Sequence, residues 1–205
     1  YRGYRQRSYP CCRRHLSLDK ENAVLHAIGL IETNSIAKGI EASDVMAKTA
    51  NVSILIAKAI CPGKYIVMVG GDVAAVQQSV KAAIALAAET AVDDFIIPSI
   101  HPSIMPAIVG GNSIGEVRAA GVIETYSVAS CIEAADAAVK AASVEPVRMH
   151  LAFGIGGKSY VVLTGEVADV EAAIKAGCEV AGEKGMLVQR VVIPRPHKQV
   201  VEHLL

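Results

Sequence analysis

The segment Ala27-Ile-Gly-Leu-Ile-Glu-Thr33 decides the fold, because it returns 92 residues later as Ala119-Ala-Gly-Val-Ile-Glu-Thr125. Further pairs of segments match downstream, at offsets that drift from 92 to 96 residues: Ile40–Ala42 with Ile132–Ala134, Gly71–Val73 with Gly165–Val167, and Ile97–Pro98 with Ile193–Pro194. Self-similarity at a fixed spacing is the signature of a repeated structural unit. The sequence therefore predicts two homologous domains of about 90 residues each.

Each copy alternates short apolar runs with helical patterns. In the first copy we expect a helix that begins near Ile36, capped by Ser35 or Thr33, and a long Ala-rich helix over 73–90. The expected strands are Ala27–Glu32, Val52–Ile60, Tyr65–Val69 and Phe95–Ile97. The order βαββαβ, repeated once, predicts an α/β protein of the α+β kind, with two ferredoxin-like units whose helices cover one face of each sheet.

The composition excludes several classes of protein. The 205 residues are 52% hydrophobic and 20% charged, which provides enough apolar material for a core and argues against disorder. No run reaches the roughly 18 apolar residues of a membrane helix, and we find no secretory signal pattern. Balanced charge and 4% aromatic residues argue against nucleic-acid binding. We expect a cytoplasmic protein without membrane or nucleic-acid partners.

The charge is unevenly distributed along the chain. Residues 1–22 contain six basic and two acidic residues, so they carry +4 and the rest of the chain carries −4. We predict a basic tail over 1–22, a first domain over 23–112 and a second domain over 113–205. The tail is interpreted as a solvated segment outside the fold; the alternative is a basic arm that docks on an acidic surface.

Several of these segments resemble one known family. They are Gly29–Thr33, Ile40–Asp44, Lys48–Val52, Gly70–Val73 and Ile193–His197. Together they are similar to the shell proteins of bacterial microcompartments, and two copies in one chain resemble the tandem-domain class, whose trimers imitate hexamers. The resemblance covers about residues 23–205. It implies a pseudohexameric homotrimer without enzymatic activity, whose edges join other shell proteins into a sheet that encloses enzymes, in a microcompartment within the cytoplasm.

The resemblance also implies which residues contact neighbouring tiles. By motif position, Lys48 and Lys140 are the edge lysines and Arg195 is the edge arginine. The first copy has Ser99 where the second has Arg195. A hydroxyl replaces a planar guanidinium poorly, so we expect the edge contact of the first copy to be made differently.

The stretch Ile60-Cys61-Pro62-Gly63-Lys64 resembles the iron–sulfur-bearing shell trimer of propanediol-utilisation compartments. In the resembled family this loop lines the central pore, formed here by Ile60, Cys61, Pro62 and Gly63. A threefold axis would bring three Cys61 thiols together, and soft thiolate ligands suit a [4Fe-4S] cluster shared by three chains. Such a cluster would carry electrons, or be transported, across the shell, with encapsulated redox enzymes as further partners. Without a cluster, Cys61 is a cysteine at an apolar loop with no metal, or one of three thiols that narrow the pore.

The remaining cysteines and histidines favour structural roles. Cys131 and Cys178 lie in Ala-rich segments and are expected to be small buried hydrophobes, while Cys11 and Cys12 lie in the tail. His101 and His197 occupy matched ends of the two copies and are interpreted as structural, and His26 and His150 lack partners at metal-ligand spacing. The glycine-rich segment 153–158 lacks the complete phosphate-loop spacing, so we expect a flexible loop there.

Two other functions are compatible with the sequence. One is the same tile without a cofactor, which gates the passage of metabolites. The other is a ferredoxin-like regulatory trimer that binds a small effector between subunits.

Overall fold

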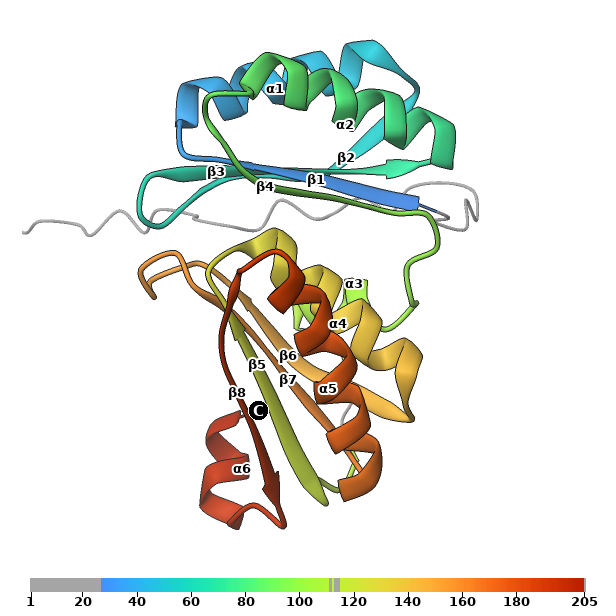
Figure 1. Ribbon diagram of the computed structural model, residues 1–205, viewed down its shortest axis with the longest axis vertical. Coiled ribbons are helices and arrows are strands. Elements are labelled where there is room, and N and C mark those ends of the chain that lie inside the picture. The colour runs from blue at the N-terminus through green and yellow to red at the C-terminus, as the bar shows by residue number, and fades with distance from the viewer. Residues whose placement is uncertain (1–26, 111, 113–114, 205) are drawn as a thin grey trace, which may run out of the picture.

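The computed structural model describes residues 27–110, 112 and 115–204, and contains two four-stranded sheets in this part of the chain (Figure 1). The basic tail 1–22, with Cys11 and Cys12, and His26 lie outside the described residues. The domain boundaries predicted after residues 22 and 112 fall within or beside stretches that the structure does not describe, and they stay predictions. Among the described helices, none is long and apolar enough to cross a membrane.

The first domain has the predicted order βαββαβ. Its elements are β1 (Ala27–Thr33), α1 (Ile36–Thr49), β2 (Val52–Ile60), β3 (Lys64–Gly71), α2 (Val73–Ala87) and β4 (Ala91–Ile97). The strands are antiparallel in the order β2-β3-β1-β4, and α1 and α2 cover one face of the sheet (Figure 1). A short helix, α3 (Ile104–Val109), follows this domain.

The second domain repeats this arrangement. Its elements are β5 (Ala119–Thr125), α4 (Val128–Ala141), β6 (Val144–Leu151), β7 (Ser159–Gly165), α5 (Val167–Glu183), β8 (Leu187–Pro194) and a final helix α6 (Lys198–Leu204). The strand order β6-β7-β5-β8 corresponds to that of the first sheet. The register corresponds as well, because Ile31 pairs with Asp94 and Ile123 pairs with Arg190. Positions related by these pairings can therefore be compared one by one.

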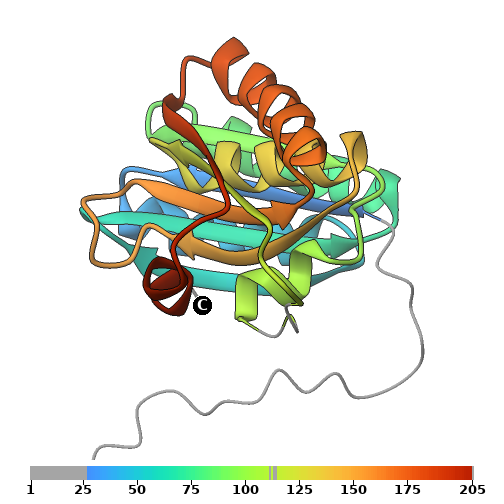
Figure 2. The same ribbon diagram turned by 90° about the horizontal axis from the view of Figure 1, so that it is seen from below.

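The structure corrects several predicted boundaries. The strand expected to end at Val69 continues as β3 through Gly70 and Gly71, because these glycines pair with Ile28 and Ala27 of the central strand. β4 begins at Ala91 rather than at Phe95, and α2 ends at Ala87. The short helices α3 and α6 were not predicted. Both lie on the opposite side of the molecule from α5 (Figure 2).

Local features explain why the two copies fold alike. Ser35 caps α1 and Ser127 caps α4, each accepting a hydrogen bond from the backbone amide three residues on. Gly29 and Gly121 occupy the same place in the two central strands. A Cβ at Gly29 would lie 2.5 Å from Val80, and one at Gly121 would lie 2.7 Å from Val170. The glycines therefore let α2 and α5 pack closely on their sheets.

The two domains share one hydrophobic core. The face of the first sheet that α1 and α2 leave uncovered carries Ile28, Leu30 and Phe95, and these residues pack in one buried cluster with residues of α4. Figure 1 shows α4 directly beneath the first sheet. The second domain thus covers the open face of the first.

Candidate functional site: the pore loop and the domain interface

The turn between β2 and β3 carries the predicted pore residues. Ile60 is buried, Cys61 is half-buried, and Pro62 and Gly63 are exposed. The turn is closed by a hydrogen bond from the Gly63 amide to the Ile60 carbonyl at 3.1 Å, and Gly63 has a φ of 85°, which favours glycine. The sequence therefore presents Cys61 at the tip of a tight turn, as predicted from Pro62 and Gly63.

The matching turn of the second domain, between β6 and β7, packs against the first. The amide of Cys61 donates a hydrogen bond to the carbonyl of Ala152 at 3.1 Å. A Cβ at Gly157 would lie 2.7 Å from the ring of Pro62 and 2.9 Å from the Cys61 carbonyl. The glycine at 157, with a φ of 84°, is therefore needed for close approach of the two turns. The glycine-rich segment, expected to be a flexible loop away from the pore axis or beside it, contacts the Cys61 turn.

Lys64 follows the turn, but its ammonium faces the domain interface. It forms an ion pair with the buried carboxylate of Glu32 and lies 3.3 Å and 3.4 Å from the carbonyls of Tyr126 and Gly157. The Lys64 side chain is 12% exposed and that of Glu32 is fully buried. Lys64 therefore holds the two domains together.

Within one chain, Cys61 is the accessible thiol among the described residues. Cys131 is fully buried and Cys178 is 5% exposed, which confirms their predicted structural roles. Burial raises the pKa of the Cys131 thiol to about 12. In the described part of the chain, no three His, Cys, Asp or Glu residues are grouped so that they could hold a metal ion. A single chain therefore presents one thiol at this turn.

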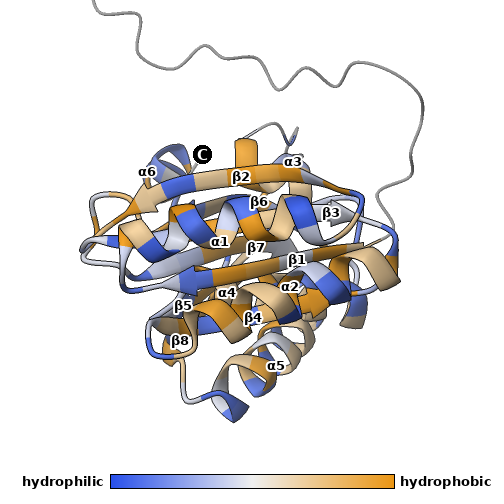
Figure 3. Ribbon diagram, turned by 90° about the horizontal axis from the view of Figure 1, so that it is seen from above, coloured by the Kyte–Doolittle hydropathy of each residue, from blue (hydrophilic) through white to orange (hydrophobic). Residues whose placement is uncertain are grey.

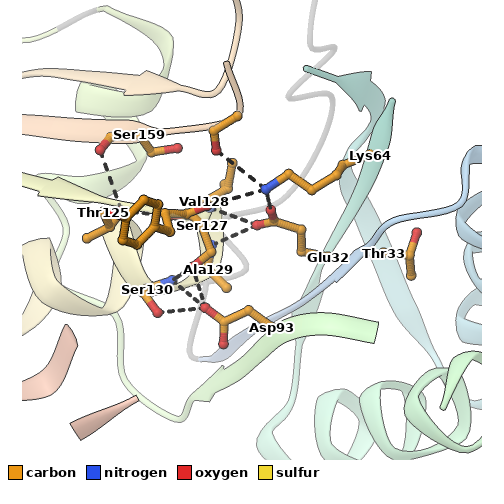
Figure 4. A network of polar contacts seen from close by, with 12 residues as sticks. Glu32, Thr33, Lys64, Asp93, Thr125, Ser127, Val128, Ala129, Ser130 and Ser159 are labelled. Carbon is orange, nitrogen blue, oxygen red and sulfur yellow. Dashed lines mark hydrogen bonds and ion pairs between the residues drawn. The ribbon is translucent and has the colours of Figure 1, made fainter. Parts of the chain in front are cut away.

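The N-terminus of α4 forms the polar centre of the domain interface (Figure 4). The second oxygen of the Glu32 carboxylate accepts hydrogen bonds from the amides of Val128 at 2.7 Å and Ala129 at 3.4 Å. These amides have no partner inside the helix, and a carboxylate is favourable at the positive end of the helix dipole. Burial raises the pKa of Glu32, and Lys64 and the two amides oppose this effect.

Asp93 of β4 binds the same helix end. Its Oδ2 accepts from the Ser127 hydroxyl, from the Ser130 hydroxyl at 2.6 Å and from the Ser130 amide at 3.0 Å. Its Oδ1 lies 3.1 Å from the ammonium of Lys184. Burial acts to raise the pKa of Asp93, but the two serines and Lys184 outweigh it and hold this pKa below its usual value.

Sequence reasoning missed this interface. Glu32 occurs in an otherwise apolar strand, and Asp93 and Asp94 begin the apolar run of β4. Buried carboxylates in such positions need partners, so the three residues were signals of an interface. The sequence could not show that the partners are amides of a helix 96 residues away.

The predicted edge residues lie in different environments. The side chain of Lys48 is 73% exposed and pairs with Asp44 at 2.6 Å. Lys140, at the same place in α4, reaches across to the first domain, where it contacts the carbonyl of Ser99 at 2.5 Å, and it pairs with Asp136 at 2.5 Å. Arg195 is exposed, with a φ of 50°, and its amide bonds to the carbonyl of Arg118 at 2.9 Å. Their roles at shell edges stay predictions.

The described histidines have local partners. The ring of His150 stacks on Tyr160 with centroids 5.4 Å apart, and its Nε2 lies 2.6 Å from the Phe153 carbonyl. The Nδ1 of His101 lies 2.8 Å from the Ser103 hydroxyl. The Nδ1 of His197 accepts from the Gln199 amide at 3.3 Å. These contacts agree with structural roles.

Residues 27–100 and 119–196 both match the BMC domain family. The chain is also 55% identical to the bacterial microcompartment shell protein PduT of Citrobacter freundii, over 85% of this chain and 95% of that protein. The chain belongs to the bacterial microcompartment shell proteins. The expected family and the tandem arrangement of its two domains are thus confirmed, and the chain is assigned to the microcompartment shell.

Solved structures agree with the architecture of this shell protein. A microcompartment protein from Desulfitobacterium hafniense superimposes with a TM-score of 0.76 at 52% identity, over 86% of this chain and 98% of that chain. The fused permuted hexameric shell protein MSM0275 of the RMM microcompartment gives a TM-score of 0.57 at 26% identity, covering 76% of this chain and 81% of its own. EutM of Salmonella typhimurium is 42% identical over 42% of this chain and 88% of its own length.

Proposed function

We propose that this shell protein assembles as a homotrimeric, pseudohexameric tile with a central pore, and that three Cys61 thiolates at the pore hold a [4Fe-4S] cluster for electron transfer or cluster transport across the shell. The observation that carries the assembly is a surface left open on each domain, which matches a surface buried inside the chain. The cluster depends on the Cys61 turn and on the resemblance of that turn to the iron–sulfur-bearing shell trimer.

The open surface on the first domain is the outer face of α1. Ile36 and Ile40 are 41% and 55% exposed, whereas their counterparts in α4, Val128 and Ile132, are fully buried against the first sheet. Large apolar side chains gathered on one helix face favour an interaction site over free solvent.

The open surface on the second domain is the face of its sheet that α4 and α5 leave uncovered. Val191 of β8 is 43% exposed, whereas its counterpart Phe95 in β4 is 2% exposed because α4 covers it. The face of α1 thus matches the buried face of α4, and the open second sheet matches the covered first sheet. Head-to-tail contact between copies would bury both, and three copies would close a ring of six domains.

The two outer helices, α3 and α6, also differ in that one is packed within the chain and the other is exposed. α3 packs against β6 of its own chain and buries Ile104, whereas the corresponding residue of α6, Val200, is 44% exposed. β2, the strand that corresponds to β6, forms an outer edge and is largely hydrophobic, with Ile54 44% exposed (Figure 3). In the ring, α6 of one copy is placed to cover β2 of the next.

The same relation supports a pore at the Cys61 turn. Within the chain, the Cys61 turn contacts the Ala152 turn. If each neighbouring pair of domains repeats this contact, six turns encircle the axis and three of them carry Cys61. The donor chemistry fits a cluster, because thiolates are its usual ligands and three chains supply three of them. When bound, the cluster would supply one-electron chemistry, and the chain's contribution is to hold each thiolate on a short, closed turn.

Iron and sulfide analysis of protein purified without oxygen tests the cluster. We expect iron and sulfide in a fixed ratio to trimer and absorption in the visible range, all lost in Cys61→Ser while the trimer mass is retained. Cys178→Ser is the matched control and should keep the iron. Equal iron contents and spectra for wild type and Cys61→Ser would reject the cluster and favour the cofactor-free tile that gates metabolites.

A further inference from the structure

The domain interface inside the chain has a charged centre built from four residues. Asp93 and Asp94 belong to the covered first sheet, and Glu133 and Lys184 belong to the covering second domain. Lys184 forms ion pairs with Asp93 at 3.1 Å and with Glu133, and its ammonium lies 2.6 Å from the Asp94 carbonyl. Lys184 therefore pairs with a carboxylate of each domain, Asp93 across the interface and Glu133 in its own domain, and also contacts the backbone carbonyl of Asp94.

The repeat places a different set of charges at the corresponding positions. The register of the sheets equates Asp93 with Gln189 and Asp94 with Arg190, because Glu32 and Ile31 pair as Glu124 and Ile123 do. Glu133 corresponds to Glu41 at the shared offset of 92 residues. The C-cap of α5 is Lys184, and the C-cap of α2 is Ala88.

The cation thus lies on the covering domain in one contact and on the covered strand in the other. In the first pair of domains the covered strand is acidic and the covering domain supplies the lysine. In the contact proposed between copies, β8 would be the covered strand and carries Arg190, and the covering first domain would supply Glu41 with no cation at its C-cap. In each case a cation on one domain faces a carboxylate on the other.

We propose that Arg190 of one copy forms an ion pair with Glu41 of the next copy, at the place that Lys184 and Glu133 occupy inside the chain. The inference rests on the proposed trimer. Arg190 is exposed on the edge strand β8, where its side chain contacts the Cys178 thiol of α5 and borders a groove of about 580 Å³ that also contains Val191; it makes no ion pair with any described residue of its own chain. Glu41 pairs with Lys38 at 2.8 Å, and its side chain is 51% exposed and accessible to a second partner.

Other charged groups lie beside Arg190 and beside Glu41. Glu171, Lys175 and Glu179 of α5 line the same groove as Arg190. On the covering side, Lys38 occupies the position of Ser130, which binds Asp93, so Lys38 faces Gln189 in the ring. Gln189 accepts a hydrogen bond from a lysine without adding a charge, which leaves Glu41 to Arg190.

Charge reversal tests the pair. We would make Arg190→Glu, Glu41→Arg and the double variant, and measure the trimer fraction against protein concentration by native mass spectrometry. Each single reversal should raise the concentration at half assembly by at least about tenfold, and the double variant should recover most of this loss. Lys81→Glu, an equal charge change at an exposed position of α2, is the control and should assemble as wild type does.

The outcomes separate this inference from the proposed assembly. A wild-type chain that stays monomeric rejects the trimer itself. A wild-type trimer whose single variants assemble normally, or whose double variant shows no recovery, rejects the Arg190–Glu41 pair alone. Unfolding midpoints of all variants, expected to agree at concentrations where each is monomeric, exclude misfolding as the cause of a loss.

Discussion

Helices α1 and α4 have nearly the same sequence pattern and opposite surroundings. α4 inserts its N-terminus between Glu32 and Asp93 and buries Val128 and Ile132 completely. α1 has the same serine cap and the same apolar positions, but it leaves them open. One chain therefore buries the apolar face of α4 in an interface between its domains and leaves the corresponding face of α1 available for a second copy.

The largest expected effect comes from the carboxylate under α4. Glu32→Ala should lower the free energy of unfolding by about 3–5 kcal/mol at every protein concentration, because it leaves the Lys64 ammonium buried without its carboxylate partner. Chemical denaturation measures this loss, and replacing Lys64 by Met in the same chain should recover part of it.

The matched variant in the second domain is Glu124→Ala. Glu124 pairs with Lys158 at 2.5 Å, and their side chains are 29% and 42% exposed, so we expect a loss of about 0–1 kcal/mol in the monomer. A loss equal to that of Glu32→Ala would contradict the difference between the two domains.

Substitutions on the apolar faces of α1 and α4 should differ in how their effect on stability depends on protein concentration. Ile132→Ala should cost about 2–5 kcal/mol at all concentrations, since Ile132 is fully buried within one chain. Ile40→Ala should lower the thermal midpoint mainly where wild type is assembled, because binding between copies contributes to apparent stability by mass action. Identical concentration dependence of the two variants would show that α1 has no partner.

The acidic range tests the contacts of Asp93. Since its pKa is lowered in the folded chain, its contribution is complete above the unfolded value near 3.8 and is lost as the pH falls through the lower folded value. Asp93→Asn should therefore be less stable than wild type at pH 6, and the two thermal midpoints should converge toward pH 2.5. The raised pKa values of Glu32, Asp94 and Glu133 act in the opposite direction. The effect of Glu32 is common to wild type and variant and cancels, whereas Asp93 helps to raise the pKa values of Asp94 and Glu133, so the variant lowers both and partly offsets the difference. A constant difference across this range would contradict the lowered pKa.

The smallest effects concern the two lysines. Lys140→Ala should lower the free energy of unfolding by about 1 kcal/mol, since it removes a contact to the Ser99 carbonyl between domains. Lys48→Ala removes one exposed pair with Asp44, worth about 0.3–0.5 kcal/mol, but should reduce sheet formation seen by electron microscopy. Sheets that form unchanged would show that Lys48 is not an edge residue.

Much of the fold could be predicted from the sequence, because the duplication shows which segments form one unit. Three local signals were not overridden by tertiary packing: Ser35 before α1, the β-branched residues of β2 and Asp72 before α2. The extension of β3 through Gly70 and Gly71 could not be predicted, because pairing with β1 overcomes the low strand preference of glycine. α3 and α6 have fewer than eight residues, and short helices lack a clear period.

The candidate site divides in the same way. Pro62 and Gly63 marked the turn that presents Cys61, since their backbone preferences are local. The partners of Glu32 and Asp93 come from a distant helix and needed the structure. The contact between the Gly157 and Cys61 turns was hidden for the same reason, because a glycine-rich segment signals flexibility and close approach equally well.

The mass of the assembly in native mass spectrometry tests the central claim most directly. If the open faces of α1 and of the second sheet meet as their counterparts do inside the chain, the protein should have three times the 21.4 kDa mass of one chain. Ile40→Asp should reduce it to the mass of a single folded chain. A wild-type monomer at micromolar concentration, or a trimer that Ile40→Asp leaves intact, would contradict the account.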